Sequence, residues 1–158
     1  MTTVDDRRDA VHDERITLMG LLVETHAQLV RALGDELERQ CGLPLMWFEV
    51  LLRLGRSTEH RLTMSQLADG VSLTSGGMTR LVDRMAGAGL VERQDCPSDR
   101  RSVHVVLTAA GLDRLGVAVQ VHLAGLDRHL LGPLDPAEVA ALGAALRKVH
   151  GERPVCGS

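Results

Sequence analysis

The chain has 158 residues, a formal net charge of −3, 44% hydrophobic residues and 25% charged residues, which is an ordinary globular composition. This length suits one domain, or one domain with helical extensions. Trp47 and Phe48 are its only large aromatic residues, which argues against binding of single-stranded nucleic acid, because base stacking needs aromatic platforms.

The first residues carry no signal for targeting or for regular structure. Residues 1–11 are polar, and we expect them to be a disordered tail. The N-terminal segment is charged and lacks the apolar core of a signal peptide. Since no apolar run is long enough to span a bilayer, the sequence predicts a cytoplasmic protein.

Two helices are expected next. Apolar residues recur at helical spacing from residue 12 to about residue 40, and Gly42 is the expected C-terminal cap. Pro44 suits the first turn of a second helix, because its missing N–H costs little there. This helix should turn Phe48 and Leu51 inward and end near Gly55, and residues 56–62 are interpreted as a polar connection.

Residues 63–86 have the pattern of a helix-turn-helix. Thr63 and Gln66 form a T-x-x-Q capping box that starts a third helix, and Thr74 or Ser75 can cap a fourth. Apolar residues at i, i+3, i+4 and i+7 give each helix one buried face: positions 64, 67, 68 and 71, then 78, 81, 82 and 85. Two short helices with such faces are typical of this motif.

A change to two-residue alternation predicts a β-hairpin after the fourth helix. Residues 90–93 and 103–107 are the expected strands. The turn-forming segment 95–102 between them carries Arg100 and Arg101 at its tip. A hairpin directly after a helix-turn-helix predicts a winged helix-turn-helix.

Two further helices complete the expected fold. Thr108 can cap a long fifth helix, and Gly132 and Pro133 then break the chain. Asp135, Pro136 and Glu138 together predict the start of a sixth helix, which runs to about residue 150 and leaves 151–158 as a tail. The predicted fold class is mainly α (α+β): a winged helix-turn-helix with one small β-hairpin and additional N- and C-terminal helices.

The negative net charge hides a basic segment. Residues 53–104 hold eight arginines and six acids, a charge of +2, whereas the remainder holds ten basic and fifteen acidic residues, a charge of −5. Local charge matters more than net charge for contact with phosphates. The predicted helix-turn-helix and hairpin are therefore the basic part of an acidic chain.

The face of the fourth helix opposite its buried residues predicts contact with DNA. Its hydroxyl groups can bond bases or phosphates, and Arg80 can pair bidentately with guanine. Gly76 and Gly77 each cost about 1 kcal/mol of helix propensity relative to alanine. We interpret these glycines as allowing the N-terminus of the helix to approach DNA closely, where a side chain would clash. The alternative is that they only relieve packing in a tight turn.

The hairpin tip adds a second contact. An arginine there suits the narrow minor groove, and Asp99 can orient Arg101; a solvated charged turn is the alternative. The predicted DNA-binding residues are Ser65, Thr74, Ser75, Gly76, Gly77, Thr79, Arg80, Arg84, Asp99, Arg100 and Arg101.

The run Asp99-x-Arg101-x5-Leu107-Thr108, followed by Gly111, resembles the D-x-R-x5-L-T signature of the multiple antibiotic resistance regulator (MarR) family. The segments GLPLMWFEVLLRL and SQLADGVSLTSGGMTRLVDRMAGAGLVER agree with it, and the resemblance covers roughly residues 12–150. Pro44 departs from the family pattern, where a threonine is more usual.

The resemblance implies a homodimeric transcription factor. Residues 43–107 would be its DNA-binding domain, and 12–42 with 108–150 its dimerisation region. A two-fold dimer predicts a palindromic double-stranded operator. Many members are repressors that release DNA when a small, often phenolic, anion binds.

The resemblance also places an effector pocket between the dimerisation helices and the DNA-reading helix. The candidate ligand-binding residues are His26, Trp47, Phe48 and Leu51, with Arg80 or Arg84 as further cations. Core packing is the alternative for each of them. Cys96, beside the arginines of the hairpin, offers control by oxidation instead, although it can equally be an incidental small side chain.

No cofactor, metal or catalytic site is predicted. The three cysteines form no CxxC pair, and His122 and His129 are too far apart to share an ion without outside ligands. Since the chain also lacks a nucleophile elbow, a P-loop and a dinucleotide fingerprint, an enzyme is not expected. A winged helix used only for protein contacts is the remaining alternative, and Arg80 argues against it.

Overall fold

The computed structural model describes residues 10–69, 75–96 and 99–151, with all of their side chains except those of residues 75, 96 and 99–102. The predicted tails at 1–11 and 151–158 fall almost wholly outside this part. No helix in the described ranges has the length and apolar character needed to cross a membrane.

The described chain is mainly helical, as the sequence predicts, and has one three-stranded antiparallel sheet. In chain order its elements are α2 (Glu14–Cys41), α3 (Leu45–Arg56), the 3₁₀ turn η1 (Thr58–His60), β1 (Arg61–Thr63), α4 (Met64–Asp69), α5 (Ser75–Gly87), β2 (Val91–Cys96), β3 (Asp99–Leu107), α6 (Ala109–Leu126), the π-helical turn η2 (Asp127–Leu131) and α7 (Pro136–His150).

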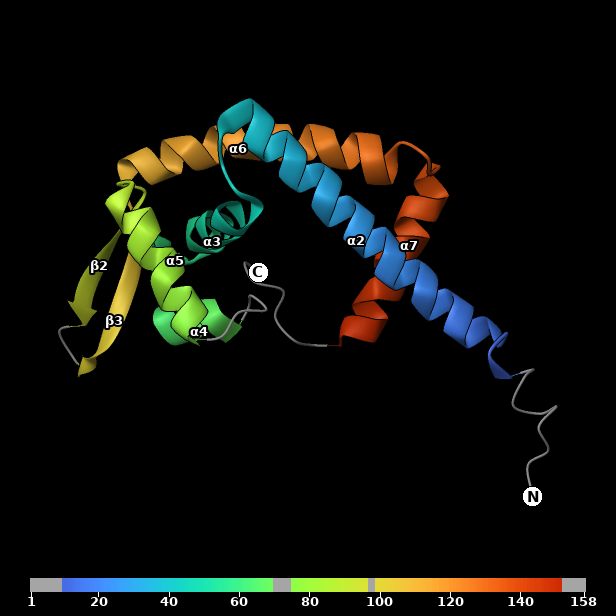
Figure 1. Ribbon diagram of the computed structural model, residues 1–158, viewed down its shortest axis with the longest axis horizontal. Coiled ribbons are helices and arrows are strands. Elements are labelled where there is room, and N and C mark those ends of the chain that lie inside the picture. The colour runs from blue at the N-terminus through green and yellow to red at the C-terminus, as the bar shows by residue number, and fades with distance from the viewer. Residues whose placement is uncertain (1–9, 70–74, 97–98, 152–158) are drawn as a thin grey trace, which may run out of the picture.

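The elements form an arch with two limbs (Figure 1). The first limb, called here the winged limb, holds α3, α4, α5 and the sheet. The second, called here the arm limb, holds α7 and the N-terminal half of α2. Helix α6 and the C-terminal half of α2 lie along the top and join the limbs, so these two helices set how the limbs are placed.

The hydrophobic core lies in the winged limb and under α6. Its largest fully buried side chains come from α2, α3, α4, α5, β3 and the α2–α3 turn: Leu37, Leu43, Phe48, Val50, Leu51, Leu54, Leu67, Met78, Val82, Met85 and Val105. Helix α7, by contrast, has no buried residue. The winged limb is therefore packed as a unit, whereas the arm limb leaves apolar surface uncovered.

Local signals start and end the helices much as the sequence predicts. Gly42 ends α2 in the left-handed conformation, with φ of 55°. The Thr63–Gln66 capping box closes through bonds of 2.8 Å and 3.2 Å, and the Asp135–Glu138 box closes at the start of α7. Pro44 differs by one position, because it is the residue before α3 rather than its first residue.

The sheet is larger than the sequence predicts. Residues 61 and 62 were expected in the polar connection and Thr63 at the start of the third helix, but all three form β1 and pair with β3, with Arg61 opposite Val106 and Thr63 opposite His104. Strands β2 and β3 also extend to Cys96 and from Asp99, so most of the predicted turn 95–102 is strand. Backbone pairing with β3, not side-chain alternation, defines β1 and lengthens the hairpin, and no local pattern predicts it.

His122 of α6 lies against the core of the winged limb. Its ring centroid is 4.6 Å from that of Phe48 on α3. Its Nδ1 is buried and has no hydrogen-bond partner in the described part of the chain. Burial lowers the pKa of His122 from its ordinary 6.5. The folded protein therefore favours the neutral ring.

This burial predicts a pH-dependent stability. Below the ordinary pKa of 6.5 the unfolded chain binds more protons than the folded one, so the free energy of unfolding falls as the pH drops from there toward the lower folded pKa. We expect His122→Phe to remove this loss when urea unfolding is compared at about pH 7.5 and about pH 5.5. Replacing the exposed His150 by leucine should leave the loss unchanged. Equal pH slopes in His122→Phe and the wild type would contradict the prediction.

Candidate nucleic-acid interface

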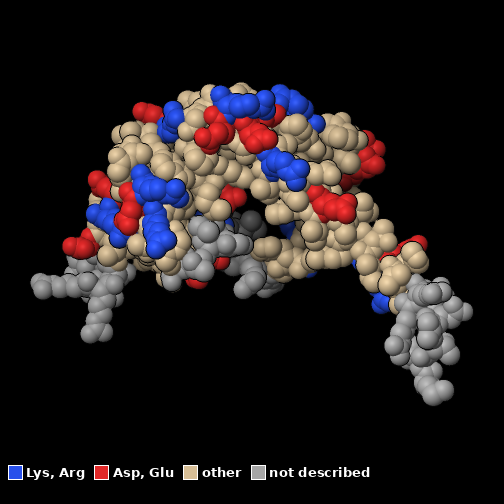
Figure 2. Space-filling model, in the orientation of Figure 1, with Lys and Arg blue, Asp and Glu red and all other residues tan. Residues whose placement is uncertain are grey.

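Helix α5 has one buried and one exposed face, as its spacing predicts. Met78, Val82 and Met85 are completely buried, and Leu81 is 3% exposed. The opposite face exposes Gly76, Thr79, Arg80, Asp83 and Arg84. Figure 2 shows Lys and Arg side chains gathered over this part of the winged limb, with acids among them. The exposed face of α5, called here the reading face, carries the groups that can bond bases and phosphates.

Gly76 lies on the reading face in the first turn of α5. A Cβ atom built there would come within 4 Å of no heavy atom in the described part of the protein. Packing within the described part of the chain therefore gives no reason for a glycine at this position. This supports the interpretation that the glycine permits a close approach to DNA.

Arg93 of β2 connects the hairpin to α5, although it was not among the predicted site residues. Its Nη2 lies 2.8 Å from Oδ1 of Asp83 and donates a 3.4 Å hydrogen bond to the carbonyl oxygen of Thr79. Such an exposed ion pair contributes only about 0–1 kcal/mol to stability, so its effect is mainly on geometry and charge. It neutralises the one acid on the reading face, beside Arg80 and Arg84. No local pattern indicates this contact, because its partners lie on separate elements.

The other predicted DNA contacts are placed less completely. Ser65 is exposed on α4, and Ser75 is the first residue of α5. Residues 99–101 lie in β3, at the end of the hairpin farthest from α6. Thr74 and the side chains of Ser75, Asp99, Arg100 and Arg101 fall outside the described part, so their roles stay predictions.

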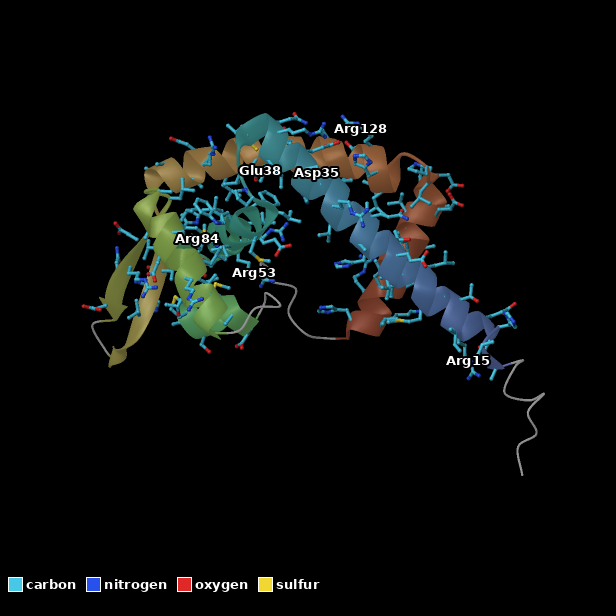
Figure 3. The ribbon with its side chains drawn as sticks, viewed as in Figure 1. Arg15, Asp35, Glu38, Arg53, Arg84 and Arg128 are labelled. Atoms are coloured by element: carbon cyan, nitrogen blue, oxygen red, sulfur yellow. The ribbon has the colours of Figure 1, made fainter. Side chains whose placement is uncertain are left out.

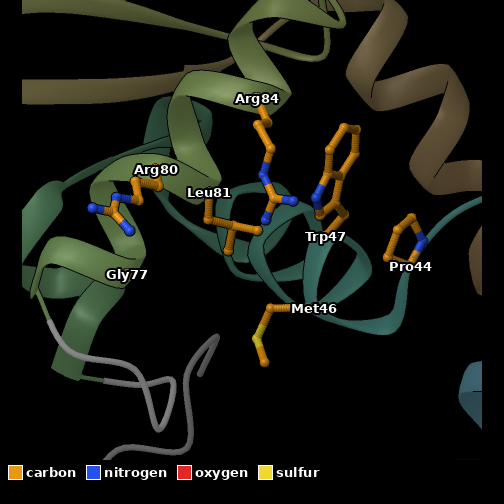
Figure 4. Close-up of a pocket in the computed structure, with 7 residues that line it drawn as sticks. All are labelled: Pro44, Met46, Trp47, Gly77, Arg80, Leu81 and Arg84. Atoms are coloured by element: carbon orange, nitrogen blue, oxygen red, sulfur yellow. The ribbon is translucent and has the colours of Figure 1, made fainter.

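A pocket of about 350 Å³ lies between the start of α3 and the middle of α5. In Figure 4, Trp47 and Arg84 lie side by side, Arg80 lies on the far side of Leu81 from them, and Met46 lies at the bottom of the view. Its lining is Pro44, Met46, Trp47, Gly77, Arg80, Leu81 and Arg84. The pocket therefore combines one aromatic wall with two guanidinium groups that also belong to the reading face.

The four residues predicted to bind an effector do not lie together. Trp47 lines the pocket, as do the two arginines named with it as further cations. Phe48 and Leu51 are 2% and 0% exposed and belong to the core, whereas His26 is exposed on α2. Phe48 follows Trp47 directly but turns into the core, so of these two neighbours Trp47 alone lines the pocket.

The cysteines and possible metal ligands of the described part can be placed as well. The Cys41 thiol donates a 3.1 Å bond to the carbonyl oxygen of Leu37, and the side chain of Cys96 is not described. No group of three or more His, Cys, Asp or Glu side chains in the described ranges is placed to hold a metal ion.

Comparisons with known proteins agree with this geometry. The sequence profile of the MarR family matches residues 42–102. The regulator PecS of Dickeya dadantii is 28% identical over 138 residues, which are 87% of this chain and 82% of PecS.

Two solved structures share the fold over most of the chain. AbsC of Streptomyces coelicolor, a MarR family transcriptional regulator, has a TM-score of 0.79 and 29% identity over 87% of this chain and 93% of its own. A cysteine-to-serine mutant of Escherichia coli MarR, complexed with operator DNA, has a TM-score of 0.75 and 30% identity over 86% of this chain and 95% of its own.

Proposed function

Because the chain belongs to the MarR family of transcriptional regulators, and so is not an enzyme, we propose that it binds double-stranded DNA sequence-specifically through α5. The observation that supports this proposal is the reading face. It exposes Gly76 in the first turn of α5, followed by Arg80 and Arg84, while the opposite face of the helix is buried. The first turn of a recognition helix lies nearest the base edges of the major groove. Arg80 and Arg84 then contact guanine or phosphate, and the hairpin arginines contact the minor groove.

The DNA-binding unit is proposed to be a homodimer on a palindromic operator. Helices α2, α6 and α7 expose large apolar side chains that the described part of the chain leaves uncovered: Ile16, Leu18, Met19, Leu21, Leu22, Val23, Val30, Leu112, Val117, Leu123, Leu142, Leu146 and Val149. So many exposed apolar residues on neighbouring helices are typical of an interface. A second copy covers them and presents a second α5, about one helical turn of DNA away.

Repression and release by a small aromatic anion complete the proposal. The pocket offers the Trp47 indole to a ring and the guanidinium groups of Arg80 and Arg84 to a carboxylate or phenolate. Both arginines belong to the reading face. A ligand bound to them therefore removes DNA contacts directly, so the repressor leaves its operator and the gene is transcribed.

The test uses the full chain and labelled DNA from upstream of its own gene. In fluorescence anisotropy we expect tight binding that falls linearly with salt on a double-logarithmic plot, because phosphate contacts release counterions. Salicylate should quench Trp47 and displace the DNA over the same concentration range. A Trp47→Leu variant should still bind the DNA but respond less to salicylate.

Three outcomes separate the parts of the proposal. Binding that does not distinguish this DNA from random duplex would contradict sequence-specific regulation. Equal affinity for a palindrome and for a single half-site would contradict the proposal that the protein binds its operator as a dimer. Salicylate that neither quenches Trp47 nor displaces DNA, tested with benzoate and phenol alongside, would contradict the ligand-binding role of the pocket.

A further inference from the structure

Glu36 is the only charged residue that is buried in the described part of the chain, with 5% of its surface exposed. It lies on α2, between the exposed acids Asp35 and Glu38. Figure 3 shows both of these exposed acids near the top of the arch, where α2 crosses α6. A buried carboxylate is costly unless partners hold it, so its surroundings need an explanation.

Two side chains of η2 hold one oxygen of this carboxylate. Arg128 donates to Oε1 of Glu36 through Nη1, and Nε2 of His129 lies 2.9 Å from the same oxygen. The hydrogen bond from His129 is the main cause of a lowered pKa of Glu36, and the charge of Arg128 adds to it. The carboxylate is thus held in its charged form by residues more than ninety positions away in sequence.

The other oxygen of Glu36 is enclosed by small and apolar groups. Oε2 is buried without a hydrogen-bond partner in the described part. A Cβ atom on Gly125 would lie 2.9 Å from Oε2 and 2.7 Å from Cδ2 of Leu33, closer than side chains normally approach. A glycine at this position therefore leaves room for the carboxylate and lets α6 pack closely against Leu33 and Glu36 of α2.

These residues lie where the two limbs of the arch separate. Helix α6 ends at Leu126, η2 follows, and α7 then turns away into the arm limb (Figure 1). Toward its N-terminus, α2 runs away from α6 into the arm limb (Figure 1). Because the winged limb is attached to the other ends of these helices, a change in their crossing moves the reading face relative to the arm limb.

We propose that Glu36, with Arg128 and His129, positions the two reading faces of the dimer at one fixed separation. This inference rests on the proposed binding of a dimer to a palindromic operator. Glu36 is a positioning residue in this scheme, since it lies on α2, far from the reading face.

A buried ion pair is better suited to this task than to raising stability. The cost of desolvation offsets much of its attraction, and apolar side chains of similar size often give equal stability. A desolvated carboxylate, however, tolerates only arrangements that keep its donors in place. An apolar replacement therefore preserves packing but permits more than one crossing of α2 and α6.

The experiment measures the affinity of the full-length dimer for palindromes whose half-site separation changes in one-base-pair steps. The wild type should prefer one separation over its neighbours by about tenfold or more, whereas Glu36→Leu should reduce this preference to about twofold. Affinity for a single half-site should stay the same. Glu36→Gln, which keeps an acceptor oxygen for both donors, should retain most of the preference.

Two further variants make the result decisive. Glu38→Leu removes an exposed charge from the same helix and should leave the preference unchanged. Arg128→Met removes the ion pair with Glu36 from its exposed side, because the Arg128 side chain is 59% exposed. It therefore tests the same interaction without changing a buried residue. It should weaken the preference even if Glu36→Leu fails to fold.

The outcomes for the inference and for the proposed function differ. If Arg128→Met and a folded Glu36→Leu keep the wild-type preference, the inference is overturned and operator binding stands. If the wild type binds all separations equally, the inference is overturned and sequence-specific binding stands. If it binds no palindrome, both are overturned.

Discussion

The Gly76→Leu substitution is expected to weaken operator binding severely while leaving the protein folded. Gly76 is exposed in the first turn of α5, and nothing in the described part of the chain lies within 4 Å of a Cβ placed there. In the proposed complex that space is filled by DNA, so a branched side chain blocks the approach. We expect the Kd to rise about a hundredfold or more, which corresponds to roughly 2.8 kcal/mol.

Stability and a matched variant separate this effect from unfolding. Leucine is a better helix former than glycine by somewhat under 1 kcal/mol, so the urea midpoint of Gly76→Leu should be equal or higher. Gly87 is equally unobstructed but lies at the opposite end of α5, and Gly87→Leu should bind the operator normally. Wild-type affinity in Gly76→Leu would mean that the start of α5 does not approach DNA.

An alanine at position 111 should have the opposite effect and damage the fold itself. Gly111 is buried in the first turn of α6, and its N–H donates a 2.9 Å bond to Oγ1 of Thr108. A Cβ there would lie 2.0 Å from the carbonyl oxygen of Leu90, which is backbone and accepts a bond from the Thr108 N–H. Since the obstruction cannot rotate away, we expect a loss near the upper end of the about 1–3 kcal/mol typical of overpacking.

Gly116 provides the control for this substitution. It lies in the same helix, and a Cβ there meets nothing within 4 Å in the described residues. Gly116→Ala should therefore raise the free energy of unfolding by about 0.5–1 kcal/mol through helix propensity. Urea denaturation of both variants gives the comparison, and an unchanged midpoint for Gly111→Ala would contradict the contact geometry.

Periodicity and capping predict most of the fold because they are local. The spacing of Met78, Val82 and Met85 separates the two faces of α5, and the boxes at Thr63 and Asp135 mark helix starts within one residue. Strand β1 is different, because Arg61–Thr63 is defined by its pairing with β3. Its sequence alone indicates only a short polar segment.

The candidate site shows the same division between local and distant causes. The exposed side of α5 follows from spacing, whereas the pocket needs α3 and α5 to be placed together, which separates Trp47 from the buried Phe48. Glu36 is the extreme case, since its partners Arg128 and His129 come from the far end of the chain. In sequence it is one acid among several on α2.

The arginines shared by the pocket and the reading face have a consequence for induction. If operator and effector compete for Arg80 and Arg84, each weakens the binding of the other by the same factor, as thermodynamic linkage requires. Operator-bound dimers then resist the ligand, and unbound dimers take it up first. The inducer concentration that switches on the gene would thus rise with the affinity of each promoter, so strong and weak operators in one cell would respond in sequence to a single signal.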